Sequence, residues 1–284
     1  MKRRREAGYA LVMAVAGAAL FAWAGFTMIE SGRGDIAMAQ ARSDRARLEA
    51  AAEAGLMLAV HGLRLGDRSD QWVADGRPRQ TRFDGTVLTI AIEDERGKVP
   101  IATASESTVR RLLSAAGLDG RKLDSLAAAI LDWMDEDDFP RMNGAEADAY
   151  RKAGADSLPR NSRIRTLDEL LNVQGMTPEI LDRIRPSMTL YFGEPGSFNP
   201  QTATPLAVMA MLGKSEDSAE VKARRQDVGE RKPALDIAGD MPMAGRPVTI
   251  RVQAELPGLG RATHVAVVQF TANPARPFWL RSYR

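Results

Sequence analysis

The chain has 284 residues, and its 39 basic and 37 acidic side chains give a formal net charge of +2. A charge so close to balance excludes a strongly basic nucleic-acid-binding protein as the first interpretation. Because 44% of the residues are hydrophobic, an acidic disordered chain is excluded as well. There is no cysteine, and the histidines are His61 and His264 alone. A disulfide framework, a thiolate metal site and a cysteine nucleophile are therefore excluded.

The N-terminal segment has the composition of a membrane-spanning helix. No charged residue occurs over the 23 positions from Ala7 to Ile29, and the basic cluster Lys2–Arg5 stands directly before them. At about 1.5 Å per residue, such a helix is about 35 Å long, which is enough to cross a bilayer core. The positive-inside bias then predicts a single-pass topology, with the N-terminus in the cytoplasm and everything after Glu30 on the other side of the membrane.

Three interpretations of this segment are open. A secretory signal peptide has an apolar core of only about 7–15 residues, and the longer run here favours either a plain signal anchor or a leader of the type IV prepilin kind. Such a leader is a short basic peptide that ends in glycine directly before the apolar helix, as the sequence does at Gly8. Prepilin peptidase would then cleave after Gly8 and leave Tyr9 as the first mature residue. We expect residues 1–8 to form the leader and residues 9–29 to span the membrane.

The helical pattern continues beyond the membrane. Apolar residues recur at three- and four-residue spacings through Leu48, Ala52, Leu56, Ala59 and Leu63. Gly66 is a suitable residue to end the helix. We therefore expect one helix of about 55 residues, apolar on all sides at first and amphipathic over residues 30–66.

The rest of the chain predicts an α+β fold, in which an antiparallel-sheet head carries a large all-helical inserted domain. Strand patterns occur at residues 83–93, 188–192, 248–256, 263–271 and 278–283. They assign residues 67–102 and 187–284 to the head. Residues 103–186 between them show helical patterns and cap signals at 103–117, 123–131, 145–153, 167–171 and 177–186. The mixed charge of residues 213–245 predicts a mobile loop or a frayed helix.

An acidic cluster lies within the predicted insertion. Seven carboxylates and a single base, Arg141, give a net charge of −6 over the 17 residues from 132 to 148. The carboxylates belong to Asp132, Asp135, Glu136, Asp137, Asp138, Glu146 and Asp148. Ca²⁺ takes six to eight oxygen ligands, and Asn143 and backbone carbonyls could complete such a shell. The spacing is not that of an EF-hand loop, so a Ca²⁺ site and a solvated acidic loop between two helices both remain open.

The segment 167–185 resembles a helix-hairpin-helix, a motif whose turn offers backbone N–H groups to DNA phosphates. Its four acidic and two basic residues give a net charge of −2, which is the wrong sign for phosphate binding. A packing unit of the insertion is therefore favoured, and a membrane-anchored DNA-binding or DNA-uptake protein is kept as the alternative function. No nucleophile elbow or phosphate-binding glycine loop occurs, so we expect no enzyme. A hydrolase that uses the acidic cluster is a third possibility.

These features in this order resemble the K-type minor pseudopilins of bacterial type II secretion systems, over nearly the whole chain. The resemblance is carried by the junction at Gly8 and by the segments 92–98 (IEDERGK), 129–137 (AILDWMDED), 143–146 (NGAE), 159–161 (PRN) and 167–178 (LDELLNVQGMTP). Residue 13, the fifth of the mature chain, is Met13, where most pilins have glutamate. K-type members characteristically lack that glutamate, so this departure from pilins in general agrees with the K type.

The resemblance implies a pilin-like head on a long N-terminal helix and a place at the tip of the pseudopilus. It also implies a single-pass protein of the bacterial inner membrane, with a cytoplasmic N-terminus and the bulk of the chain in the periplasm. The implied partners are the I- and J-type minor pseudopilins, the major pseudopilin, prepilin peptidase, the inner-membrane assembly platform and membrane lipid, but no nucleic acid. It also implies Ca²⁺ in the helical domain, and methylation of the amine of Tyr9. The expected ligands are Asp135, Asp137 and Glu146, with Asp132, Asp138 and Asp148 as further candidates. The sequence departs from the family after Lys98, where an Asn-rich turn is replaced by Val99-Pro-Ile-Ala.

Overall fold

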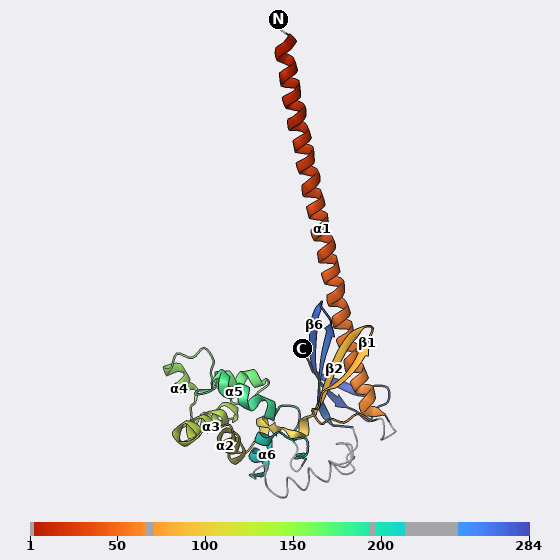
Figure 1. Ribbon diagram of the computed structural model, residues 1–284. Coiled ribbons are helices and arrows are strands. Elements are labelled where there is room, and N and C mark those ends of the chain that lie inside the picture. The colour runs from red at the N-terminus through yellow and green to blue at the C-terminus, as the bar shows by residue number, and fades with distance from the viewer. Residues whose placement is uncertain (1–2, 66–70, 194–196, 214–243) are drawn as a thin grey trace.

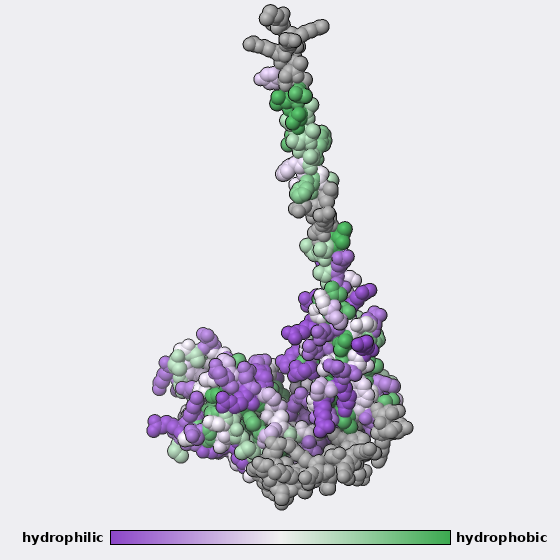
Figure 2. Space-filling view, viewed as in Figure 1, coloured by the Kyte–Doolittle hydropathy of each residue, from purple (hydrophilic) through white to green (hydrophobic). Residues whose placement is uncertain are grey.

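The computed structural model describes residues 3–65, 71–193, 197–213 and 244–284. The longest element is helix α1 (Arg3–Arg64), which extends far beyond the rest of the molecule (Figure 1). The prediction of one continuous N-terminal helix is confirmed, and the helix starts early enough to include Gly8 and Tyr9. Within it, Leu11–Met28 has a mean hydropathy of 1.9 and none of it is buried (green in Figure 2). These properties are compatible with a single membrane-spanning helix.

The C-terminal part of α1 packs on a five-stranded antiparallel sheet in the order β1-β2-β5-β6-β7. The strands are β1 (Arg79–Phe83), β2 (Thr86–Asp94), β5 (Pro247–Leu256), β6 (Gly260–Phe270) and β7 (Phe278–Tyr283). Alternate residues of β2 are buried, since one face of the sheet is turned to the helix. The shared core includes Leu56 and Leu63 of the helix and Ile90 and Val252 of the sheet. The α+β fold class is confirmed.

Close approach between α1 and the sheet depends on glycine. A Cβ at Gly55 would lie 2.6 Å from Cγ1 of Val252.

The helix is also held by a polar contact, because Nε2 of His264 on β6 lies 2.5 Å from Oε2 of Glu49 on α1. The Tyr283 hydroxyl on β7 contacts the other ring nitrogen of this histidine. His264 therefore joins the helix to two strands.

A mostly helical segment separates β2 from β5 and lies beside the sheet (Figure 1). Its elements are η1 (Glu95–Gly97), β3 (Val99–Pro100), η2 (Ile101–Thr103), α2 (Glu106–Ala115), α3 (Gly120–Met134), α4 (Ala147–Lys152), η3 (Leu167–Asn172), α5 (Pro178–Ile184), η4 (Arg185–Ser187), β4 (Met188–Thr189) and α6 (Pro205–Leu212). The predicted strand at 188–192 is only the two residues of β4, and it pairs with β3 in a separate small sheet. The predicted helix at 167–171 is the 3₁₀ helix η3.

The helical insertion has a hydrophobic core of its own, distinct from the core under α1. Helix α6 belongs to this core through Ala207, Val208 and Ala210. The helical core thus extends past residue 186, where the sequence prediction places its end. The predicted loop at 213–245 lies almost entirely outside the described residues.

A buried polar network joins the entrance of the insertion to the chain that leaves it. Nη2 of Arg96 lies 2.6 Å from Oδ2 of Asp94, and both side chains are almost fully buried. Nδ2 of Asn199 donates to Asp94 over 3.3 Å, and its backbone N–H donates to the carbonyl of Arg96 over 2.9 Å. Since Asp94 ends β2, this network ties the helical insertion to the sheet.

Candidate cation site in the helical insertion

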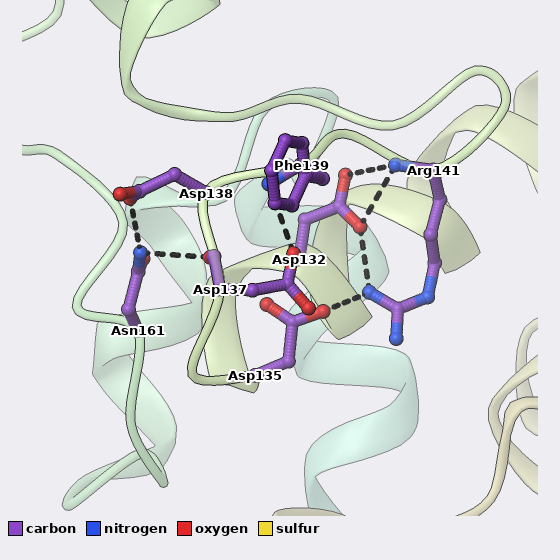
Figure 3. A network of polar contacts seen from close by, with 7 residues as sticks. All are labelled: Asp132, Asp135, Asp137, Asp138, Phe139, Arg141 and Asn161. Atoms are coloured by element: carbon purple, nitrogen blue, oxygen red, sulfur yellow. Dashed lines mark hydrogen bonds and ion pairs between the residues drawn. The ribbon is translucent and has the colours of Figure 1, made fainter.

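The acidic cluster is built on the C-terminal end of α3 and the loop that follows it (Figure 3). Asp132 is on the buried face of α3 and is 0% exposed, so its carboxylate needs partners inside the protein. Arg141 supplies them: its Nη1 donates to Oδ1 of Asp132 over 2.8 Å, and its backbone N–H donates to Oδ2 over 3.2 Å. The same Nη1 also contacts Asp135, the C-cap of α3.

The close return of the loop to Asp132 depends on a glycine. A Cβ at Gly144 would lie 2.0 Å from Oδ2 of Asp132, so no other residue fits there without a shift. Asn143, directly before it, adopts a left-handed conformation with φ of 67°. The turn 143–144 is thus shaped to let the loop close over a buried carboxylate.

Two further carboxylates of the loop are held by Asn161 and by the backbone. Nδ2 of Asn161 donates to Oδ1 of Asp138 over 2.6 Å and to the carbonyl of Asp137 over 2.9 Å. The carboxylate of Asp137 accepts the backbone N–H of Phe139 over 2.9 Å. Asp137 and Asp138 are both exposed, so these contacts shape a loop at the surface (Figure 3).

Glu146 is the carboxyl group most strongly perturbed by the cluster. It is 5% exposed. Burial raises its pKa to about 7, with Asp132, Asp135 and Asp138 raising it further and the backbone N–H of Ala147 opposing the shift. Neither of its carboxylate oxygens has a hydrogen-bond partner among the described residues. A buried carboxyl with unpaired oxygens beside other carboxylates is an arrangement that a cation would stabilise.

The structure brings together most of the predicted ligands but not all of them. Asp148 is exposed and forms an ion pair with Arg151 over 2.7 Å, so its inclusion in the predicted ligand set is not supported. In the described part of the chain, no three carboxylate or histidine side chains surround one point closely enough to hold a metal ion as they stand. One reason is visible in the geometry, since the guanidinium of Arg141 occupies the position between Asp132 and Asp135 (Figure 3).

The oxygen atoms of this region that have no hydrogen-bond partner among the described residues nevertheless suit a hard cation. Four buried oxygens in this region have no hydrogen-bond partner among the described residues: Oδ1 of Asp135, both carboxylate oxygens of Glu146 and Oδ1 of Asn161. All four are carboxylate or amide oxygens, which are the ligands that Ca²⁺ prefers. Asn161 is not among the predicted ligands, because an isolated amide 23 positions beyond Asp138 has no local spacing signal.

A second carboxylate of the insertion shows how the far side of the loop is held. Glu169 is buried, which by itself raises its pKa, but hydrogen bonds from the Arg165 backbone and the Trp133 indole and the charge of Arg160 outweigh burial and lower the pKa. Nε1 of Trp133 donates over 3.1 Å and Nε of Arg160 over 2.7 Å. Trp133 directly follows Asp132 on α3, and Asn161 directly follows Arg160. The Glu169 contacts therefore support the residues next to the acidic cluster.

The hairpin between η3 and α5 is occupied by internal contacts. The backbone N–H of Gln174 donates to the hydroxyl of Tyr150 over 2.9 Å, and that of Met176 donates to the carbonyl of Val173 over 3.0 Å. Arg183 contacts the carbonyl of Ala116. These donors are thus directed into the insertion and not toward a phosphate, as expected of a packing unit.

Comparison with known proteins agrees with this architecture. Residues 88–193 match the family model described as type II secretion system protein K. Proteins named type II secretion system protein K include one from Pectobacterium carotovorum, 27% identical over 150 residues, which are 53% of this chain and 43% of that protein. One from Dickeya chrysanthemi is 32% identical over 116 residues, which are 39% of this chain and 32% of that protein. The matched region thus spans less than half the length of either relative.

A crystal structure of the GspK-GspI-GspJ complex from enterotoxigenic Escherichia coli contains a chain of similar fold. The TM-score is 0.56 at 14% sequence identity, and the match covers 89% of this chain and 98% of that chain. At this identity the likeness concerns the fold alone. The family-model match and the protein K relatives show that the segment 88–193 of this chain is similar to the type II secretion system protein K family.

Proposed function

We propose that the protein is a minor pseudopilin that caps the tip of a type II secretion pseudopilus and acts as a structural subunit, not as an enzyme. The observation that carries the proposal is the combination of an apolar N-terminal helix with a sheet head that holds a bulky helical insertion. The helix supplies an apolar surface for the membrane and for packing against other subunits. The insertion makes the head too wide for another subunit to stack above it.

The proposed partners are I- and J-type minor pseudopilins, because the crystal structure that contains the similar chain is a complex of GspK with GspI and GspJ. The alternative of a DNA-binding protein has no support from the relatives, all of which are named for secretion. The net negative charge of the hairpin segment argues against it as well.

The sequence around Tyr9 supports the tip position. A carboxylate buried in a bilayer needs a partner, and in pilins the glutamate at the fifth mature position is thought to meet the N-terminal amine of a neighbouring subunit. A tip subunit has no subunit beyond it to offer that amine, and this chain has Met13 at the position. The basic residues before Ala7 favour a cytoplasmic N-terminus and a periplasmic head.

We also propose that the acidic cluster binds Ca²⁺. The side-chain oxygens that would hold it are those of Asp135, Glu146 and Asn161, with Asp137 and Asp138 at the rim and Asp132 beneath. When bound, the ion would supply positive charge to oxygens that lack partners among the described residues. Its function would be to stabilise the loop after α3, and no reaction is implied.

Assembly tests the function directly. The full chain, expressed with the I- and J-type subunits of its own organism and extracted in detergent, should copurify with both as one species in size-exclusion chromatography. Recovery of the chain without either partner, in conditions where the two partners associate with each other, would contradict the proposal. Binding of duplex DNA at physiological salt would favour the alternative.

Leader processing tests the membrane part separately. Gly8→Ala should block removal of residues 1–8 by prepilin peptidase, seen as a precursor of unchanged size on a gel. Gly17→Ala is the matched control within the same helix, and it should be processed normally. Normal processing of Gly8→Ala would refute the assigned cleavage position.

A further inference from the structure

A cleft of about 310 Å³ separates the outer face of the sheet from the helical insertion. Its floor is made by residues of β2, β5, β6 and β7, including Arg251 and Val267. Its other wall comes from the insertion, at residues 165–168 and 185–191. Figure 2 shows hydrophilic side chains on both sides of the hollow between these two parts. The cleft shares no lining residue with the acidic cluster, although Arg165 also lines a second hollow together with Asp135 and Glu136.

The charges that line the cleft leave an excess of arginine. Its acidic residues are all paired, since Nζ of Lys98 lies 2.8 Å from Glu93 and 2.6 Å from Glu95, and Arg185 lies 2.5 Å from Asp168. Arg165, Arg251 and Arg284 also line the cleft, and all three are exposed. Within the described part of the chain, none of these three has a carboxylate partner. Three unpaired guanidinium groups at one cleft favour an anionic ligand.

The remaining lining combines hydroxyl groups with apolar side chains, so the cleft is not shaped for a bare ion. Met188 and Leu190 contribute from the insertion, and Val265 and Val267 contribute from β6. Ligand clefts with apolar walls and a few placed charges select molecules that carry both features. An acidic peptide with apolar side chains has both.

The outer edge of β7, which pairs with no further strand among the described residues, provides a place for the backbone of such a peptide. β7 is the last strand of the sheet, and its Ser282 and the following Arg284 line the cleft. Arg284 and Val265 exchange both backbone hydrogen bonds, at 2.8 and 3.1 Å. The alternation of an antiparallel ladder then points the N–H and C=O of Tyr283 away from β6. On the same strand Trp279 is 52% exposed and Leu280 is 50% exposed, which is unusual for an unprotected edge.

We propose that this cleft is a docking site for an extended acidic segment of a partner protein, which adds a strand to the edge of β7 and directs carboxylates at Arg165, Arg251 and Arg284. Strand addition uses main-chain hydrogen bonds for affinity and alternate side chains for specificity. Here the specificity lies in glutamate or aspartate at the positions facing the cleft, and apolar residues at the positions between. This site is independent of the tip assignment, because the test needs only the isolated chain.

Binding of a defined probe tests the proposal. The probe is the fluorescein-labelled, capped peptide Glu-Val-Glu-Ile-Glu-Val-Glu, added to the full chain in detergent and followed by fluorescence anisotropy. Arg165→Gln and Arg251→Gln should each weaken binding by about tenfold, the loss of one charge-assisted contact. Arg82→Gln is the matched control, an exposed arginine on β1 at the opposite edge of the sheet, and it should bind as the unmodified chain does.

Two altered probes separate the charge from the strand. A peptide with lysine in place of glutamate should not bind, and a peptide N-methylated at alternate amides should bind at least about tenfold more weakly. Equal binding of the methylated peptide, or full competition by millimolar inorganic phosphate, would overturn the proposal in favour of a small-anion site. Absence of binding at about 1 mM peptide would overturn it outright. So would binding by both arginine variants that is as tight as that of the unmodified chain.

Discussion

Replacing Glu146 with glutamine removes the most strained carboxyl group of the insertion and tests the account of the acidic cluster. The pKa of this group rises from an ordinary 4.5 to about 7 in the folded chain. Between these two values the folded protein binds more protons than the unfolded one, so stability falls as the pH rises. The full loss of stability caused by ionised Glu146 is therefore present above pH 7, and it is absent below pH 4.5.

The size of the effect follows from the shift. One pKa unit corresponds to about 1.4 kcal/mol, so ionised Glu146 lowers the free energy of unfolding by up to about 3 kcal/mol above pH 7. Glutamine has a similar shape and no charge. In the absence of divalent cations, Glu146→Gln should therefore stabilise the protein by about 1–3 kcal/mol at pH 8 and leave its stability unchanged at pH 4.

The assay is urea denaturation of the full chain in detergent with EGTA, followed by tryptophan fluorescence, since Trp133 is 2% exposed beside the cluster. Glu136→Gln is the matched control, an exposed carboxylate on the same loop, and it should give a much smaller gain. A loss of stability in Glu146→Gln at pH 8, or an equal gain at both pH values, would refute the electrostatic argument.

Adding Ca²⁺ should make the unmodified chain more stable than Glu146→Gln, which reverses the order of stability expected without the ion. The ion stabilises whatever folded form binds it, by an amount set by its concentration relative to the dissociation constant. The unmodified chain should therefore gain stability with millimolar Ca²⁺, and Glu146→Gln should gain less. If Ca²⁺ leaves the unmodified chain unchanged in denaturation and in calorimetry, the calcium proposal is wrong, while the pH prediction still stands.

Two further substitutions test how the parts of the molecule are joined. Asp94→Asn leaves the buried guanidinium of Arg96 without its counter-charge, and it should lower the free energy of unfolding by about 3–5 kcal/mol, measured by urea denaturation. Gly55→Ala places a methyl group 2.6 Å from Cγ1 of Val252, and it should cost about 1–3 kcal/mol in the same measurement through forced separation of α1 from the sheet.

Matched controls distinguish these effects from those of the substitutions themselves. Asp148→Asn breaks an exposed ion pair with Arg151 and should cost less than about 1 kcal/mol. Gly17→Ala adds a methyl group that meets nothing within 4 Å, so it should not lower the free energy of unfolding. If Asp94→Asn costs no more than Asp148→Asn, the buried network does not hold the insertion. If Gly55→Ala is as mild as Gly17→Ala, the contact with Val252 is not tight.

The elements that the sequence predicts well are those whose signal repeats along the chain. The spacing of Leu48, Leu56 and Leu63 predicts both the helix and its buried face, because the same residues meet the sheet. The strands at 248–256 and 263–271 are predicted to within a few residues, since each is a long run rich in β-branched residues. Helix α6 lacks such a signal, because its eight residues are apolar on every side and show no preferred face.

Composition predicts the acidic cluster, but it does not predict the internal pairing. Asp148 and Asp132 have the same side chain, yet Asp148 is exposed in the first turn of α4, while Asp132 is buried on α3. No sequence pattern distinguishes Arg141 from the other arginines. Its contact with Asp132 depends on the return of the loop at Gly144. Partners that are distant in sequence are fixed by how the loop closes, which no local pattern encodes.

The place of the insertion explains how the two proposed sites of opposite charge can coexist in a chain of nearly zero net charge. The segment leaves the sheet after Asp94, and the buried contacts of Asp94 with Arg96 and Asn199 tie it to the end of β2. Its acidic loop follows α3, whereas Arg165 and Arg185 lie where the insertion faces the sheet. Two surfaces of opposite charge on one insertion would allow the proposed cation and the proposed acidic segment to bind together, since the two proposed sites share no residue.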